Sequence, residues 1–187
     1  MRYLLVLFFL VSCSAPSPRS AFSVVLPAGW STEHIPFPIS FAPSLAYSGT
    51  ENAYFSPGWG NVDSAEYWSY AFLWWLDGSV AFDTASLRAD LFTYYDGLVR
   101  SNIQRRAIPY SSVSPTSVTI DSALRGTVGF FDYMGRKPIL LNYRLHLIHC
   151  GGHTALLANL SPQPFSGPVW EKFESLDTSF HCLPGFR

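Results

Sequence analysis

The sequence predicts an α+β domain in which two helices flank an antiparallel sheet. Apolar residues alternate with a period of two in the middle of the chain, as in a strand that is buried on both faces. Two other segments carry apolar residues at helical spacing, and turn-like connections separate strand-like segments in the C-terminal half. The predicted order is therefore strand, long excursion, strand, helix, antiparallel strands, helix.

The first part of the domain is expected to hold an opening strand, an irregular excursion and a central strand. Residues 22–27 are strand-like and run into a Pro-Ala-Gly turn signal. Residues 33–60 carry prolines at positions 36, 38, 43 and 57, which exclude a long helix and predict short extended pieces between turns. Residues 66–76 alternate cleanly, with large apolar side chains on both sides. We expect this last segment to be a central strand covered on both faces.

Two helices are predicted from apolar spacing. The first begins at Asp83 or Thr84, either of which can cap its N-terminus, and ends near Arg100. Residues 109–115, bounded by prolines, form a linker after it. The second helix spans residues 168–176, with a proline in its first turn. It is expected to present three apolar side chains to the sheet, those of Val169, Phe173 and Leu176.

Four strand-like segments lie between the helices, at residues 118–120, 124–133, 139–149 and 154–160. Short connections separate the last three, so these strands are expected to form an antiparallel C-terminal meander. In the third segment alternate residues are apolar and face the core, whereas Asn142, Arg144 and His146 form a polar face. This face is a candidate site for an anionic or hydrogen-bonding ligand. A face that is solvated or covered by a helix is the alternative.

Aromatic residues are concentrated between Trp30 and Trp75. Trp59 lies in a Pro-Gly-Trp-Gly turn and is therefore the best candidate for an exposed ring that stacks on a sugar. Burial of the aromatic residues in the core is the alternative explanation for this composition.

The N-terminus carries an export signal. One basic residue precedes an apolar run from Leu4 to Val11, which is too short to span a bilayer but fits the apolar region of a cleaved signal peptide. The four residues Leu10-Val11-Ser12-Cys13 resemble the lipobox of bacterial lipoproteins. The resemblance implies that residues 1–12 are removed and that Cys13 receives a diacylglyceryl group and a fatty acid such as palmitate.

The same resemblance indicates where the protein is anchored. Ser14 follows the cysteine in place of the aspartate that retains lipoproteins at the inner membrane, so a cell-envelope location at the outer membrane is favoured, on its periplasmic leaflet or at the cell surface. Residues 13–21 are then a polar, proline-stiffened tether, and residues 22–187 form one domain. The alternative is an ordinary secretory signal that is cleaved near Ala15, which would discard Cys13.

Charge composition limits the classes of partner. Thirteen acidic residues nearly balance twelve basic residues, which excludes the strongly basic surface that nucleic-acid binding requires. The expected partners are the membrane, through the lipid anchor, and an envelope protein or a small ligand.

Two cysteines remain once Cys13 is acylated. In an oxidising compartment this even count predicts a disulfide between Cys150 and Cys182. A metal site is the alternative, because four of the five histidines lie near these cysteines and imidazole and thiolate bind zinc or copper. The candidate ligands, besides His146, are His149, His153 and His181.

The sequence contains no motif that assigns a catalytic residue or a cofactor. The opening Phe-x-Val-x-Leu-Pro-x-Gly-Trp, the meander and the terminal Trp170-x-x-Phe173 helix resemble the Mog1/PsbP-like fold, an α/β/α sandwich. That resemblance implies an accessory or binding protein rather than an enzyme. The leading hypothesis is a lipid-anchored, non-catalytic binding module. The alternative is an envelope metal-binding or hydrolytic enzyme that uses the region of His146, His149, Cys150 and His153.

Overall fold

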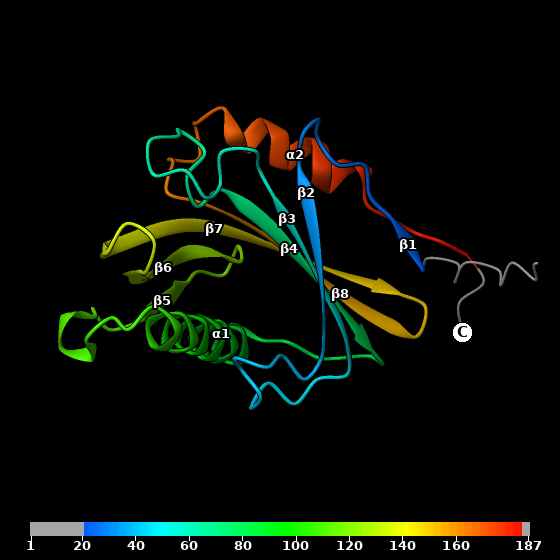
Figure 1. The fold of residues 1–187 in the computed structure, drawn as a ribbon. Helices are drawn as coiled ribbons and strands as arrows, with labels where there is room; N and C mark the ends of the chain where they lie inside the picture. Colours follow the sequence, from blue (N-terminus) through cyan, green and yellow to red (C-terminus); the bar gives the residue numbers. More distant parts are fainter. Residues whose placement is uncertain (1–20, 185–187) are drawn as a thin grey trace, which may run out of the picture.

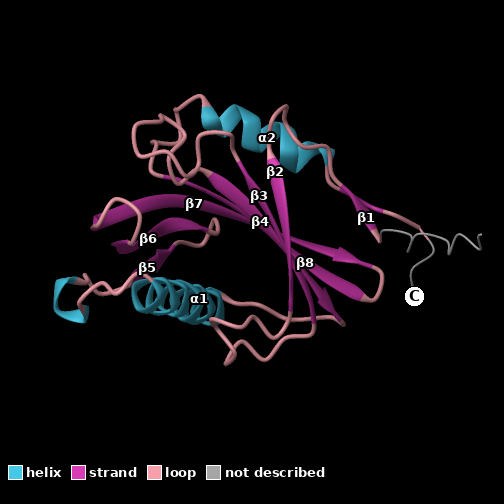
Figure 2. Cartoon of the chain, in the orientation of Figure 1, coloured by secondary structure: helices cyan, strands magenta, loops and turns pink. Residues whose placement is uncertain are grey.

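The computed structural model describes residues 21–184 and confirms the α+β class. Seven antiparallel strands form one sheet in the order β2-β3-β4-β8-β7-β6-β5, with one helix packed on each face (Figure 1; Figure 2). The strands are β2 (Ser31–Pro36), β3 (Gly49–Phe55), β4 (Tyr70–Asp77), β5 (Ser117–Ile120), β6 (Arg125–Asp132), β7 (Lys137–Cys150) and β8 (His153–Ser161). The helices are α1 (Thr84–Arg105) and α2 (Val169–Ser179), with a short 3₁₀ turn, η1 (Tyr110–Ser112), after α1.

β4 is an interior strand, third of seven in the sheet order, and both of its faces are buried as predicted. Tyr70, Phe72, Trp74 and Leu76 belong to the core on the α1 side of the sheet. The residues between them belong to a second core beneath α2, namely Ala71, Leu73 and Trp75. The strand begins at Tyr70 rather than at residue 66, because residues 66–68 form a turn in which Trp68 has a φ of 53°.

The short extended pieces predicted within residues 33–60 are present, but they are longer and more regular than expected. β2 and β3 pair with each other and β3 pairs with β4, so that both are regular members of the sheet. The prolines punctuate these strands rather than prevent them: Pro36 is the last residue of β2, and Pro57 follows β3. The two prolines between them, at positions 38 and 43, lie in the connecting loop.

The opening strand is shorter than predicted and does not join the main sheet. β1 (Phe22–Ser23) pairs with β9 (His181–Cys182) in a separate two-stranded ribbon. This ribbon lies at one end of the molecule, beside the turn between β7 and β8 (Figure 1). Helix α1 begins, as predicted, after Asp83, whose side chain accepts a hydrogen bond from the backbone N–H of Ser86.

Helix α1 is longer than predicted and reaches Arg105. Asn102 and Ile103 continue its buried stripe beyond the expected end near Arg100, so tertiary burial extends the helix by about one turn. The helix crosses from β4, inside the sheet, to β5 at the far edge, and packs on β5 and β6. From β5 the chain pairs with β6, and the expected meander of β6 to β8 then returns to β4. Within residues 21–184, no helix has the length and apolar character needed to span a membrane.

Candidate functional site

A cavity of about 470 Å³ lies between the second half of α1 and the β2–β4 part of the sheet. Its volume is in the range of small-molecule sites, which are usually concave and mostly apolar. Seven of its sixteen lining residues are aromatic: Phe41, Phe55, Trp59, Trp68, Tyr70, Tyr94 and Tyr133.

The strand register explains why these residues face one space. Glu33 of β2 pairs with Ala53 of β3, and Ile35 pairs with Glu51, so all four side chains point toward α1. Ala53 contributes only a methyl group to the wall, which leaves room that a larger residue would fill. From the other side, α1 contributes residues three or four positions apart, which share one helix face: Tyr94, Leu98, Ser101, Asn102 and Arg105.

A buried carboxyl group forms part of the wall. Glu51 is completely buried; its Oε1 accepts a hydrogen bond from the Tyr94 hydroxyl at 2.7 Å, and its Oε2 accepts one from Trp74 Nε1 at 3.0 Å. Burial raises the pKa of Glu51 to about 7, although the two hydrogen bonds favour the ionised form and oppose this shift. Near neutral pH, Glu51 is therefore divided between its neutral and ionised forms.

A tyrosine pair lies behind this carboxyl group. The hydroxyls of Tyr70 and Tyr95 are 2.5 Å apart and completely buried. Burial raises the pKa values of Tyr70, Tyr94 and Tyr95 well above the usual value near 10, so all three phenols stay neutral at physiological pH. They can donate or accept hydrogen bonds but carry no charge.

The open side of the cavity is polar. Glu33 and Ser40 lie there on the sheet side, and Ser101 and Arg105 lie on the helix side. The Arg105 guanidinium donates to the Ser101 carbonyl at 3.4 Å and to Asn102 Oδ1 at 3.1 Å, so it is held along its own helix. A ligand that enters would therefore pass polar groups before it reaches the aromatic wall.

We expect the free energy of unfolding to fall as the pH rises from 5 to 8, and to fall less in Glu51→Gln. The folded-state pKa of about 7 lies above the unfolded value near 4.5, so ionisation of Glu51 opposes folding across this window. The full effect is on the order of 3 kcal/mol.

Urea denaturation at four pH values measures this change in the free energy of unfolding. An equal pH slope in wild type and Glu51→Gln would show that Glu51 does not titrate in this range. Asp90→Asn is a control for the acidic end of this pH range, because burial also raises the pKa of the Asp90 carboxyl group.

The polar face of β7 lies beneath α2, far from this cavity in the fold. Arg144 contacts Asp177 of α2 at 3.0 Å, and its guanidinium lies over the Trp170 ring at 5.7 Å. His146 Nε2 is 3.1 Å from the same Asp177 carboxylate, and Asn142 donates to the Gln163 carbonyl at 3.0 Å. The arrangement matches the alternative of a helix-covered face, because the side chains proposed to bind a ligand contact their own chain.

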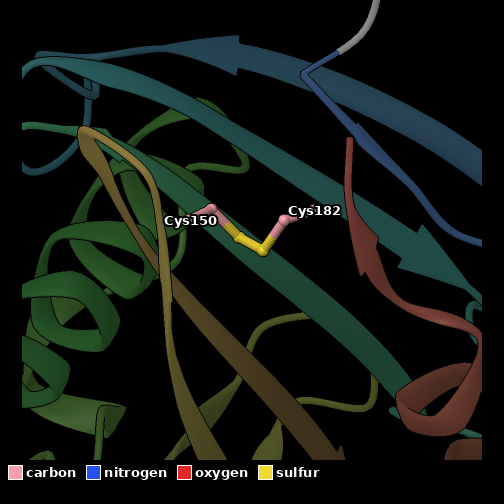
Figure 3. The surroundings of a disulfide bond; sticks show 2 residues. All are labelled: Cys150 and Cys182. Carbon is pink, nitrogen blue, oxygen red and sulfur yellow. A yellow bond between two sulfur atoms is a disulfide. The ribbon is translucent and has the colours of Figure 1, made fainter. Parts of the chain in front are cut away.

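The disulfide between Cys150 and Cys182 is confirmed, and Figure 3 shows it joining the β7 end to the C-terminal segment. The bond removes both cysteines from the candidate metal ligands. His149 and His181 are exposed, whereas His153 stacks on Trp75, with ring centroids 4.9 Å apart. In the described part of the chain, no three His, Cys, Asp or Glu residues are placed to hold a metal ion.

Among the site residues predicted from the sequence, Trp59 lies at the cavity, where its ring is 4.6 Å from that of Phe55. Its side chain is half-buried, so Trp59 is neither the fully exposed ring nor the fully buried core residue that the sequence left as alternatives. Sequence reasoning missed Glu51 and Tyr94. The alternation of Glu51, Ala53 and Phe55 was a signal for Glu51, but the prolines at positions 43 and 57 pointed to turns. No local signal in the sequence connects Tyr94 with Glu51.

Comparisons with protein-family models, with curated proteins and with solved structures found no match to this chain. The chemistry of the cavity is therefore interpreted from its own residues.

Proposed function

We propose that this chain is a lipid-anchored, non-catalytic binding protein of the cell envelope and that the cavity beside α1 holds its small ligand. The cavity carries this proposal, because it combines a ligand-sized aromatic space with a buried carboxyl group whose hydrogen bonds come from α1 and β4. A carboxyl group in such a place costs stability, and binding sites are where such a cost is commonly retained.

The anchor is proposed from the lipobox alone, because residues 1–20, with Cys13, the signal peptide and most of the tether, lie outside the described residues. Ser14 supports an outer-membrane location. A tether of nine residues reaches at most about 30 Å. The β1 end of the domain would therefore stay close to the membrane surface.

The finer fold assignment is also a proposal. The α/β/α layering and the order of the elements support a Mog1/PsbP-like fold. By analogy, this fold favours a binding or accessory role over catalysis. The partner is a small ligand, with an envelope protein as a further possibility that the lipid anchor would favour.

Filling the cavity should abolish ligand binding. A thermal-shift screen of envelope metabolites identifies compounds that stabilise the wild-type protein, and Ala53→Leu should lose these shifts because the larger side chain occupies the space beside Glu51. Ala85→Leu, which adds the same atoms at an exposed position of α1, is the matched control and should keep them. Shifts that persist unchanged in Ala53→Leu would place the ligand elsewhere and refute this site.

Replacing Cys13 with alanine should release the protein from the membrane. Without the thiol no acyl chains are attached, and acyl chains supply the binding free energy of the anchor, about 0.8 kcal/mol for each buried methylene. Membrane fractionation and labelling with a fatty-acid analogue measure the change, with Ser12→Ala as a control that keeps a small residue before the cysteine. If Cys13→Ala remained labelled and membrane-bound, the anchor would be wrong.

A further inference from the structure

Several aromatic rings line the cavity and pack against one another. The ring centroids of Phe55 and Tyr70 are 5.8 Å apart, and those of Trp59 and Tyr70 are 6.5 Å apart. On the opposite side, the Phe41 and Tyr94 rings lie 5.0 Å apart. Aromatic faces carry partial negative charge and attract cations within about 6 Å, most strongly where water is excluded.

The charged groups of the cavity favour the same kind of ligand. Within the described residues that line it, Glu33 and Glu51 are acidic and Arg105 is the single base. Arg105 is exposed and donates to groups on its own helix, whereas Glu51 is completely buried. The strongest uncompensated charge inside the cavity is therefore negative whenever Glu51 is ionised, and a low dielectric increases its attraction for a cation.

We propose that the cavity binds a small organic ammonium cation, with the aromatic rings around its charge and Glu51 as the buried counter-charge. This inference rests on the proposed function, because it names the ligand class of the same site. The side chains that donate hydrogen bonds to Glu51 also cover it, so the carboxylate does not touch the ligand. It influences the ligand through Tyr94. The Tyr94 hydroxyl donates to the carboxylate while its ring lines the cavity, and an acceptor at the hydroxyl makes that ring more electron-rich.

Other ligand classes fit the cavity less well. An anion would meet Glu33 at the open side and Glu51 in the wall. A neutral sugar carries no charge that Glu33 and Glu51 would attract. An ammonium group is attracted by aromatic rings and by nearby negative charge, and the lining supplies both.

The proposal includes a dependence on pH. The groups that face Glu51 or share its cavity come from four places: Glu33 on β2, Tyr70 and Trp74 on β4, Tyr94, Tyr95 and Arg105 on α1, and Tyr133 after β6. The tyrosines stay neutral because burial raises their pKa values, that of Tyr133 to about 12. A bound cation favours the ionised form of Glu51. The affinity of the cavity for the cation should therefore rise between pH 5.5 and pH 8, because Glu51 of the free protein loses its proton over this range.

The test compares a cation with its neutral carbon analogue on the mature chain, purified in a non-ionic detergent. Titration calorimetry with choline and with 3,3-dimethylbutan-1-ol, which has the same shape without the charge, measures the preference. We expect choline to bind about tenfold more tightly in wild type at pH 8. In Glu51→Gln this preference should shrink to about twofold, and the pH dependence should disappear.

Two further variants keep the outcome clear. Glu33→Gln changes an exposed residue that does not threaten folding, and it should weaken choline binding by about two- to threefold. Ala53→Leu should block the binding of both compounds.

Choline that does not bind at 10 mM, or binds no better than the alcohol, would overturn the ammonium assignment. If a neutral compound then binds and Ala53→Leu blocks it, the proposed binding function stands; if Ala53→Leu blocks nothing that binds, that function fails as well.

Discussion

Replacing Asp177 with alanine should lower the free energy of unfolding by about 3 to 5 kcal/mol. Asp177 of α2 accepts hydrogen bonds from Arg144 at 3.0 Å and from Asn159 Nδ2 at 2.8 Å. The side chains of Arg144 and Asp177 are each only 14% exposed, so water cannot replace the lost carboxylate at the guanidinium. The change therefore leaves a charged group and an amide without their acceptor beneath the helix, and urea denaturation measures the loss.

A matched control lies one turn earlier on the same helix. Glu174 is 3.6 Å from Arg144, but its side chain is 65% exposed, so Glu174→Ala should cost less than about 1 kcal/mol. Combining Asp177→Ala with Arg144→Met should recover much of the lost stability, because the uncompensated charge is removed. Equal small losses in Asp177→Ala and Glu174→Ala would contradict a structural role for this ion pair and would return Arg144 to the candidates for ligand binding.

Removing the disulfide should lower the free energy of unfolding by about 3 to 4 kcal/mol. The bond closes a loop with a sequence separation of 32 residues, and its loss allows the unfolded chain many more conformations. It also holds β9, and through β9 the short strand β1, against the β7–β8 hairpin (Figure 3). The Cys150→Ser and Cys182→Ser double variant, compared with wild type by urea denaturation, measures the effect.

Reduction provides an independent check on this value. A thiol reductant should shift the unfolding midpoint of wild type toward that of the double variant and should leave the double variant unchanged. A thiol count on the unfolded, unreduced domain should show no free thiol at these two positions. A wild-type midpoint that does not respond to complete reduction would show that the bond adds nothing to stability.

The first expectation concerns the partner of Arg144 and the second concerns the two cysteines. The sequence identified Arg144 and the cysteines, but their roles depend on α2 and the C-terminal segment. The alternation in β7 places Asn142, Arg144 and His146 on one polar face, and the structure agrees. A polar face by itself does not say what covers it. The acceptor that decides the matter, Asp177, belongs to a helix whose apolar residues anchor it to the same face of the sheet.

The sequence by itself determined the features that depend on local period and on cysteine parity. These are the alternation of β4, the capped start of α1, the meander of β6 to β8, and the bond between Cys150 and Cys182. Each follows from neighbours along the chain or, for the disulfide, from the even number of cysteines that acylation of Cys13 would leave. The lipobox at Cys13 is equally local, and it stays a prediction.

Only the tertiary structure decided the cavity and the buried carboxyl group within it. Glu51 lies on β3, its donors Tyr94 and Trp74 lie on α1 and β4, and no sequence period links the three. The extended pieces of β2 and β3 were predicted, but their membership of the main sheet was not, because the nearby prolines resemble loop signals until the partner strands are in place. The crossover of α1 toward β5 leaves the β2–β4 side of the sheet open enough for a cavity. Long-range packing sets both the space and the pKa of Glu51, because burial is a property of the whole fold.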